Sequence, residues 1–319
     1  MSGQDRIYEM ITERMISQLE AGVVPWRKPW ATSGIGGFPQ NIKSKKQYRG
    51  INVFLLSGTY GSPWWGTYDQ MAEASGARKV SDNSRRGFHY EKDGEPWTGL
   101  KGEKSTVIVF WKRLLISERD ESGETTKKTI PMLRYFNVFN AEQVTGMPEK
   151  YLPMDTTVDA DPTVVLEAAQ KIHDEYLARE GAPAYKEIGA RAFYTCDGSD
   201  KITVPPRELF TTEEEYHSTR FHEETHSTGA ESRCNRPGVN TFDHFGSQKY
   251  SKEELVAEMG AAMLMAIAGI ESKATFENSA AYVGNWLKNL KSDHKLVIQA
   301  AAQAQRAVDH ILGVTYEEA

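Results

Sequence analysis

The stretch RFHEETHSTG (residues 220–229) determines how the C-terminal half of this chain is interpreted. Residues four apart on a helix project from the same face, so His222 and His226 can reach one metal ion. Neutral imidazoles suit zinc, which in catalytic sites takes three protein ligands and keeps one position for water. Glu223 lies about 100° around the helix from His222. There it can accept a proton from the bound water, so the spacing predicts a mononuclear zinc site with a catalytic glutamate.

A third metal ligand must come from another element of the chain. Glu254 follows the motif in SKEELVAEMGAAM, and Glu258 lies one turn further along the same helical face. We predict that Glu254 binds the metal and that Glu258 holds a ligand histidine from behind. Two alternatives remain open, because Ser251 and Glu254 also have capping-box spacing and Glu253 competes as a ligand. Manganese or iron could replace zinc at such a site.

Hydrophobic periodicity and capping signals predict a mostly helical C-terminal half with a small sheet. Thr212 and Glu215 have the spacing of a capping box at the start of the metal-binding helix, which Gly229 can end. Short extended segments precede this helix, around Asp197-Gly198. The expected helices span 164–179, 211–229, 251–269, 279–291 and 293–312, and the extended segments lie within 192–204.

The N-terminal half has the pattern of an α+β domain. Residues 5–21 form an amphipathic helix that Gly22 can end, and residues 105–116 and 127–139 are two strands of a hairpin. The segment 148–163 is rich in proline and acids and has no clear period, which is typical of a linker. At 319 residues the chain is long enough for two domains with a core each. We therefore predict an α+β protein with domains at 1–147 and 164–319.

The N-terminal half is basic and rich in aromatic residues, whereas the C-terminal half is acidic. Residues 1–150 hold 22 Lys and Arg against 17 Asp and Glu, and the remaining residues hold 16 against 27. This asymmetry indicates that only the first half meets a polyanion. Aromatic and basic residues alternate in PWRKPW (25–30) and WKR (111–113), and single-strand binders combine positive grooves with aromatic faces that stack on bases. A packed turn explains PWRKPW equally well, because tryptophan is mainly a core residue.

Composition and cysteine usage favour a protein of a reducing compartment. The first residues lack the order of a signal peptide, and the most apolar run, MGAAMLMAIAGI (259–270), is too short to span a bilayer. Cys196 and Cys234 form no metal-type pair and no disulfide scaffold. We therefore expect a cytoplasmic protein without a membrane partner.

The C-terminal half resembles the zincin-like metallopeptidase domain of ArdC-type anti-restriction proteins over far more than the metal motif. The resemblance implies His222, His226 and Glu254 as metal ligands and Glu223 as the catalytic carboxylate. It differs from commoner family forms at Glu224-Thr225, where apolar or small residues are frequent. The matching residues are Tyr194, DKITVPP (200–206), Phe210, Tyr216, Thr228-Gly229, Arg233, Arg236 and EELVAE (253–258).

Residues 5 to about 147 are similar to the ArdC-type single-stranded-DNA-binding domain, which also occurs at the start of some plasmid primases. The resemblance implies single-stranded DNA as a partner. The segment 81–98 does not match and looks like an insertion, so its Arg85 and Arg86 are not counted as contacts. The matching stretches are PWRKPW (25–30), YRGIN (48–52), GEK (102–104), VIVFWK (107–112) and YFNVFNAEQ (135–143). The candidate DNA contacts are Lys45, Lys46, Tyr48, Arg49, Trp26 and Trp30.

These observations lead to one main hypothesis and two rivals. The main hypothesis is an anti-restriction protein of a mobile element that binds single-stranded DNA and carries a zinc peptidase site for a restriction enzyme or another protein. The first rival is a DNA-tethered metalloprotease acting on proteins bound to DNA. The second is a non-enzymatic DNA-binding protein with a structural metal. Glu223 favours catalysis, because a purely structural metal site has no need of a general base.

Overall fold

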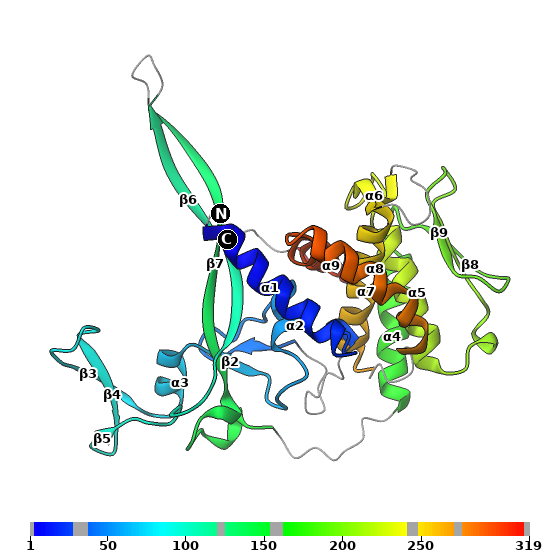
Figure 1. Ribbon diagram of the computed structural model, residues 1–319. Helices are drawn as coiled ribbons and strands as arrows, with labels where there is room; N and C mark the ends of the chain where they lie inside the picture. Colours follow the sequence, from blue (N-terminus) through cyan, green and yellow to red (C-terminus); the bar gives the residue numbers. More distant parts are fainter. Residues whose placement is uncertain are drawn as a thin grey trace.

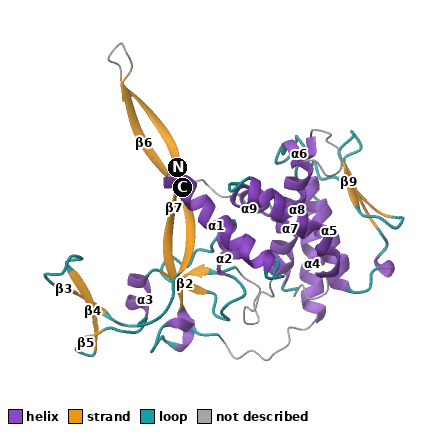
Figure 2. Ribbon diagram, in the orientation of Figure 1, coloured by secondary structure: helices purple, strands orange, loops and turns teal. Residues whose placement is uncertain are grey.

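The computed structural model describes residues 3–27, 38–119, 125–153, 162–240, 248–270 and 276–315. These residues form the expected α+β fold, with a strand-rich N-terminal half and a helical C-terminal half (Figure 2). The elements of the N-terminal half are α1 (Gly3–Glu20), η1 (Pro25–Arg27), β1 (Gln40–Asn41), α2 (Ile51–Leu56), β2 (Trp64–Gly66), α3 (Tyr68–Ala74), β3 (Arg78–Ser81), β4 (Phe88–Lys92), β5 (Glu95–Pro96), β6 (Thr106–Arg119), β7 (Thr125–Asn140), η2 (Ala141–Gln143) and η3 (Glu149–Tyr151).

The β6–β7 hairpin is the largest feature of the N-terminal half. Its strands pair antiparallel from Thr106↔Val138 to Arg119↔Thr125, so the predicted hairpin is confirmed and is longer than expected. β-Branched and aromatic residues recur in both strands, as extended pairing favours. The hairpin joins a four-stranded sheet of order β1-β2-β7-β6, and its outer part projects away from the rest of the molecule (Figure 1).

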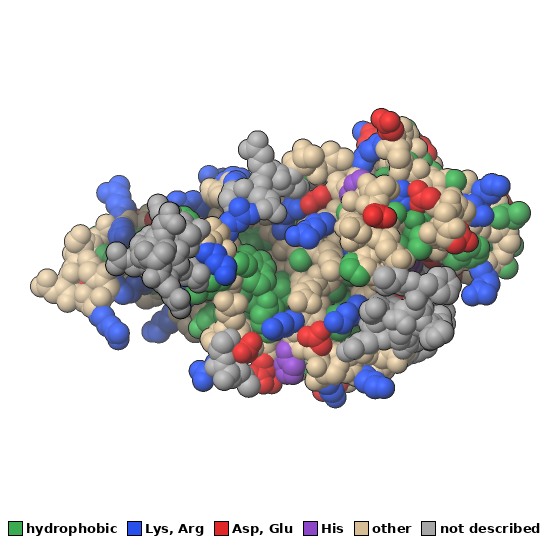
Figure 3. Space-filling model, turned by 90° about the horizontal axis from the view of Figure 1, so that it is seen from above, with side chains coloured by type: hydrophobic (Ala, Val, Ile, Leu, Met, Phe, Trp, Pro, Cys, Tyr) green, Lys and Arg blue, Asp and Glu red, His purple; other side chains and the backbone are tan. Residues whose placement is uncertain are grey.

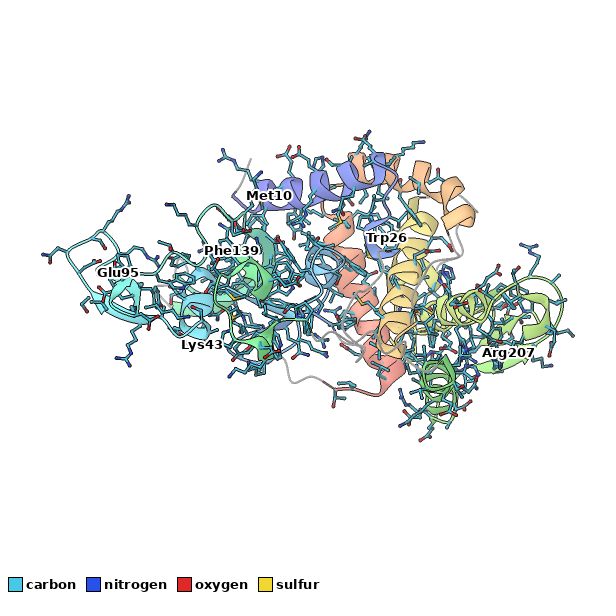
Figure 4. All side chains as sticks on the ribbon, turned by 90° about the horizontal axis from the view of Figure 1, so that it is seen from below. Met10, Trp26, Lys43, Glu95, Phe139 and Arg207 are labelled. Carbon is cyan, nitrogen blue, oxygen red and sulfur yellow. The ribbon has the colours of Figure 1, made fainter. Side chains whose placement is uncertain are left out.

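A second, separate sheet contains most of the segment that looked like an insertion. It has the strand order β3-β4-β5 and lies far from the helical half, with Glu95 at its outer side (Figure 4). Arg86 lies in the turn between β3 and β4 and forms an ion pair of 2.6 Å with Asp69 of α3. A local contact therefore engages this arginine.

The C-terminal half places its helices beside a small sheet of order β8-β10-β9. Thr212 begins the helix that carries His222 and His226 as predicted, because its Oγ1 accepts a hydrogen bond from the backbone N–H of Glu215 at 3.2 Å. The elements are α4 (Pro162–Leu177), β8 (Ala184–Glu187), β9 (Phe193–Thr195), β10 (Lys201–Val204), η4 (Arg207–Leu209), α5 (Glu213–Ser227), α6 (Pro237–Asn240), α7 (Gln248–Ala268), α8 (Phe276–Ser292) and α9 (Leu296–Leu312).

The predicted capping box at Ser251 is wrong. Helix α7 begins at Gln248, so Ser251 lies inside its first turn and is not the capping residue. The apolar pattern used for the prediction starts later than the helix does, because polar residues fill the first turn. Glu254 therefore has no capping role that would compete with metal binding.

The largest hydrophobic core is built from both halves of the chain. Helix α1 contributes Ile11 and Met15, and helices α7 and α9 contribute Met263 and Val308. Thr12 Oγ1 also donates a hydrogen bond to the carbonyl of His294 at 2.6 Å. This shared core differs from the expected core in each half, although a smaller cluster around β4 and α3 belongs to the N-terminal half alone.

The predicted linker at 148–163 is only partly visible. It begins with the short helix η3 and ends in the first turn of α4, and residues 154–161 lie outside the described part of the chain. The domain boundaries at 147 and 164 stay predictions. None of the described helices is long and apolar enough to cross a lipid bilayer.

Candidate metal centre

Helices α5 and α7 bring the candidate metal ligands together. Helix α5 carries His222 and His226 one turn apart, and α7 packs against it with Glu254 near both rings. The two helices approach closely at Gly260, where a Cβ atom would lie 2.6 Å from the Thr225 side chain. Because Thr225 directly precedes His226, this close packing fixes the position of the histidine-bearing turn against α7.

The three predicted ligands converge on one point. The Nε2 atoms of His222 and His226 are 3.1 Å apart, and oxygens of Glu254 lie 3.3 Å from His226 Nε2 and 3.6 Å from His222 Nε2. Tetrahedral bonds of 2.0–2.2 Å would place neighbouring ligand atoms about 3.3–3.6 Å apart. The spacing therefore fits a divalent metal, and the triad is the one such group among the residues described.

Two further carboxylates lie next to the histidine nitrogens that face away from Glu254. Glu258 Oε1 lies 3.7 Å from His222 Nδ1, and Glu253 Oε1 lies 3.3 Å from His226 Nδ1. A carboxylate in this position fixes the orientation and tautomer of a ligating histidine. The sequence suggested Glu253 only as a competing ligand. In the structure it lies beside Nδ1 of His226, as Glu258 lies beside Nδ1 of His222.

Arg236 anchors Glu253 from the loop that follows α5. Its guanidinium is buried and contacts the two carboxylate oxygens of Glu253 at 2.6 and 3.0 Å. It also donates to the carbonyl of Thr225 at 2.7 Å and to Thr228 Oγ1 at 2.6 Å. The sequence does not predict this contact, because Arg236 and Glu253 are 17 positions apart and no hydrophobic period connects them. Arg236 appears there only among the residues that match the family.

Glu223 lies beside the triad and is 7% exposed. Burial raises the pKa of Glu223, against the opposing effect of His222, His226 and a hydrogen bond from the backbone of Tyr194 on β9. A raised pKa is common among carboxyl groups that act in proton transfer.

The two histidines and Glu254 shift one another's pKa values. Burial alone would lower the pKa of each histidine, but hydrogen bonding to Glu254 raises that of His222, and bonding to Glu253 and Glu254 raises that of His226 well above its ordinary value. Burial would raise the pKa of Glu254, yet the two histidines hold it well below its usual range. A metal ion bound by the triad would compete with protons for the two imidazoles.

The opposite side of α5 carries a buried polar network. Glu224 is fully buried and forms a hydrogen bond of 2.5 Å with His173 Nδ1 on α4. Arg220, also fully buried, donates to Gln170 Oε1 of α4 at 2.8 Å. These contacts explain the unusual polar pair within the motif, since Glu224 ties α5 to α4 and Thr225 packs against Gly260 of α7.

The predicted DNA contacts at residues 45–49 differ in how exposed they are and in whether other residues already bind them. Lys45 and Lys46 are exposed. Tyr48 is half-buried, and its hydroxyl accepts a hydrogen bond from Asn41 Nδ2 at 3.2 Å. Arg49 forms an ion pair with Asp309 of α9, so its charge is already engaged within the protein.

Trp26 is not a DNA contact in this structure. Its side chain is fully buried and packs edge-on against Trp286 of α8, with ring centroids 5.1 Å apart. It lies between α1 and the C-terminal helices (Figure 4) and cannot offer its face to a base. The packed-turn explanation of this part of PWRKPW is therefore the right one, and Trp30 lies outside the described residues.

Comparisons with known proteins match both halves of the chain. Residues 5–139 match the family model of the N-terminal domain of anti-restriction factor ArdC, and residues 171–303 match that of a zincin-like metallopeptidase. The crystal structure of the antirestriction protein ArdC from plasmid R388 is 34% identical, with a TM-score of 0.67, over 97% of this chain and 99% of that one. Its Mn(II)-bound structure gives the same identity and TM-score over 96% and 97% of the two chains.

Longer proteins contain a related segment. Two Escherichia coli proteins named DNA primase TraC are 33% and 34% identical over 98% and 96% of this chain. The chain spans only 20% and 27% of their lengths. An uncharacterised protein of Sinorhizobium fredii, y4eC, is 29% identical over 95% of this chain and 90% of its own length.

Proposed function

The chain belongs to the ArdC antirestriction family, and on this premise we propose that it is an antirestriction protein of a mobile element that binds single-stranded DNA and hydrolyses a peptide bond at a zinc site. The observation that carries the proposal is the convergence of His222, His226 and Glu254 at tetrahedral spacing, with buried Glu223 beside them. The excess of cations in residues 1–150 supports the DNA-binding part.

Each residue of the centre has a distinct role in this proposal. His222, His226 and Glu254 hold the ion, which supplies Lewis acidity that activates water and polarises a carbonyl. Glu223 takes a proton from the attacking water and returns it to the leaving amine, a task that suits its raised pKa. Glu253 and Glu258 keep the two imidazoles in the ligating tautomer.

Strand β9 supports a peptide as the substrate. Within the described residues it pairs only with β10, so its other edge has no strand partner there. The backbone of Tyr194 on this strand is close enough to Glu223 to lower the pKa of that carboxyl, which supports a position of the strand edge beside the proposed general base. An extended peptide that pairs with β9 would therefore pass the metal centre, as in other cases of strand addition.

Zinc is proposed because two imidazoles and one carboxylate are a common set of zinc ligands. The same ligands accept manganese or iron, and the related R388 protein has been crystallised with Mn(II). Elemental analysis of protein purified without added metal should find zinc at one ion per chain. Manganese or iron in its place would change the proposed ion and leave the proposed ligands intact.

The decisive experiment is transfer of unmodified plasmid DNA into a restricting host that expresses either the intact protein or Glu223→Gln. The substitution is nearly isosteric and removes only the general base. We expect the intact protein to protect the plasmid and the variant to lose most of this protection while it still binds one metal ion.

Two outcomes would contradict parts of the proposal. Equal protection by the metal-loaded variant would show that coverage of DNA is sufficient and that the metal centre is not needed for protection. Equal affinity of the intact protein for single-stranded and double-stranded DNA, with no protection, would contradict the antirestriction role itself.

The similarity to the TraC primases favours a second candidate function. A segment that recurs within much longer DNA primases can serve as a DNA-tethered metalloprotease that acts on proteins bound to DNA, independently of restriction. DNA-stimulated cleavage of a DNA-bound protein, in the absence of any restriction enzyme, would favour this function over the first.

A further inference from the structure

The inner part of the β6–β7 hairpin exposes an unusual number of aromatic side chains. Phe110, Trp111, Tyr135 and Phe136 are 41%, 46%, 52% and 42% exposed. Large exposed aromatic side chains that cluster on one element mark interaction surfaces. Figure 3 shows hydrophobic side chains at the surface of the molecule, with Lys, Arg, Asp and Glu side chains near them.

The alternation of side chains along the strands divides these aromatics between two faces. Phe110 and Phe136 share one face and are in contact, with ring centroids 5.0 Å apart at an angle of 39°. Trp111 and Tyr135 lie on the other face, where Trp111 already contacts Tyr8 of α1. Among the described residues, the Phe110–Phe136 pair therefore offers the aromatic surface of the hairpin that α1 does not contact.

This face rests on a rigid support. Ile108, which pairs with Phe136, belongs to a buried cluster with Leu56, Trp65 and Val138. Tyr48, a predicted DNA contact, packs against the same cluster. Phe110 and Phe136 are therefore next to residues of the same face that are buried in this cluster.

Positive charge accompanies the two phenylalanines. Arg134 pairs with Phe110 across the strands, and Lys112 follows Phe110 on the same face. From Ile108 to Leu114 and their cross-strand partners, all of them described, these two cations are the only charged side chains of the face. All acidic residues between positions 105 and 140 lie within 118–124.

From this arrangement we infer that single-stranded DNA is held on a platform formed by Phe110, Phe136, Lys112 and Arg134. The inference rests on the proposed binding of single-stranded DNA and assigns its location. Unpaired bases can stack on the two rings while the cations neutralise phosphates, which is the combination that single-strand binders use. A duplex keeps its bases stacked on each other and cannot use the rings in this way.

The test is fluorescence anisotropy of a labelled oligothymidine with the full-length chain. Phe110→Ala combined with Phe136→Ala should weaken binding at least about 10-fold, because each lost base stack is worth about that much. Tyrosine at both positions should restore most of the affinity, since it keeps the ring. Both side chains are exposed, so the variants should unfold at the temperature of the unmodified protein.

The roles of Lys112 and Arg134 can be measured separately through the salt dependence of DNA binding. Lys112→Ala and Arg134→Ala should each reduce the slope of log affinity against log salt by about 0.7, the value for one phosphate contact on a single strand. The alanine variants of the phenylalanines should leave this slope unchanged.

A matched control lies on the other face of the same hairpin. Leu115 is 74% exposed, and Leu115→Ala should bind the oligonucleotide like the unmodified protein. Unchanged binding by the double phenylalanine variant would overturn the inference, as would a loss confined to Trp111→Ala and Tyr135→Ala. Failure of the unmodified protein to bind single-stranded DNA would instead overturn the proposed function from which the inference starts.

Discussion

At the scale of single residues, Arg236 supports the candidate metal centre although it is not one of the three candidate ligands. It holds Glu253, which in turn contacts His226 Nδ1. We expect Arg236→Gln to weaken zinc binding about 10- to 100-fold, because loss of an outer contact lets the ligand ring reorient. Isothermal titration with zinc checks this. Arg207→Gln, which breaks a surface ion pair with Glu213, is the control and should bind zinc normally; equal affinities in both variants would refute the role of Arg236.

The same centre predicts how metal binding depends on pH. The pKa of His226 lies well above its ordinary value, and that of His222 is also raised. Zinc must displace these protons, so affinity should be highest above the raised histidine pKa values and should fall as pH decreases through them. Zinc titrations at pH 8, 7 and 6 should show a steady loss of affinity. Constant affinity across this range would contradict protonation of the triad.

At the scale of elements, the close packing of α5 against α7 determines the geometry of the three candidate ligands. We expect Gly260→Ala to lower the free energy of unfolding by about 1–3 kcal/mol, because the added methyl group has no room beside Thr225. Zinc affinity should fall as well, since the two helices carry different ligands. Thermal unfolding and zinc titration measure the two effects.

Gly284 of α8 provides the matched control for that substitution. A Cβ atom there would meet nothing within 4 Å, so Gly284→Ala should raise the free energy of unfolding by about 0.5–1 kcal/mol and leave zinc affinity unchanged. If Gly260→Ala behaved like Gly284→Ala, the close approach of α5 and α7 would not matter for the metal centre.

Elements with a strong local pattern could be predicted from the sequence. The amphipathic period of α1 and the alternating strands β6 and β7 gave their positions to within a few residues, because each pattern lies within the element itself. The start of α7 was placed wrongly, since its first turn is polar. The motif of His222, Glu223 and His226 could be found in the sequence because its residues lie within one helix. The contact of Arg236 with Glu253 joins a loop to a helix, so no periodic pattern in the sequence reveals it.

At the scale of the whole molecule, the sequence could not show which aromatic residues are covered. Trp26 is buried against Trp286, 260 positions away in the chain, while Phe110 and Phe136 are exposed. All of these residues lie near basic side chains in the sequence. Burial here depends on long-range packing, and neighbouring residues alone do not reveal it.

The shared core predicts that the two halves unfold together. Arg49 pairs with Asp309, and the backbone N–H of Gly50 donates to Gln305 Oε1 at 3.0 Å, so polar contacts reinforce the apolar ones across the two halves. We expect one cooperative thermal transition. Two separate transitions in calorimetry would show that the halves have independent cores.

A double-mutant cycle of Arg49→Ala and Asp309→Ala measures the link between the halves. We expect a coupling of about 1 kcal/mol, because the pair is only partly buried. Affinity for single-stranded DNA should not change in Arg49→Ala, since this arginine is engaged by α9. A large loss of DNA binding without loss of stability would restore Arg49 as a DNA contact.

The hydrogen bond between Thr12 and His294 also has a consequence for folding during synthesis on the ribosome. The two residues are 282 positions apart, and synthesis proceeds at about 5–20 residues per second. Helix α1 therefore emerges roughly 15–60 s before its last partners. During that interval the apolar side chains of Ile7, Ile11 and Met15 have no complete core to enter and stay exposed to non-native contacts.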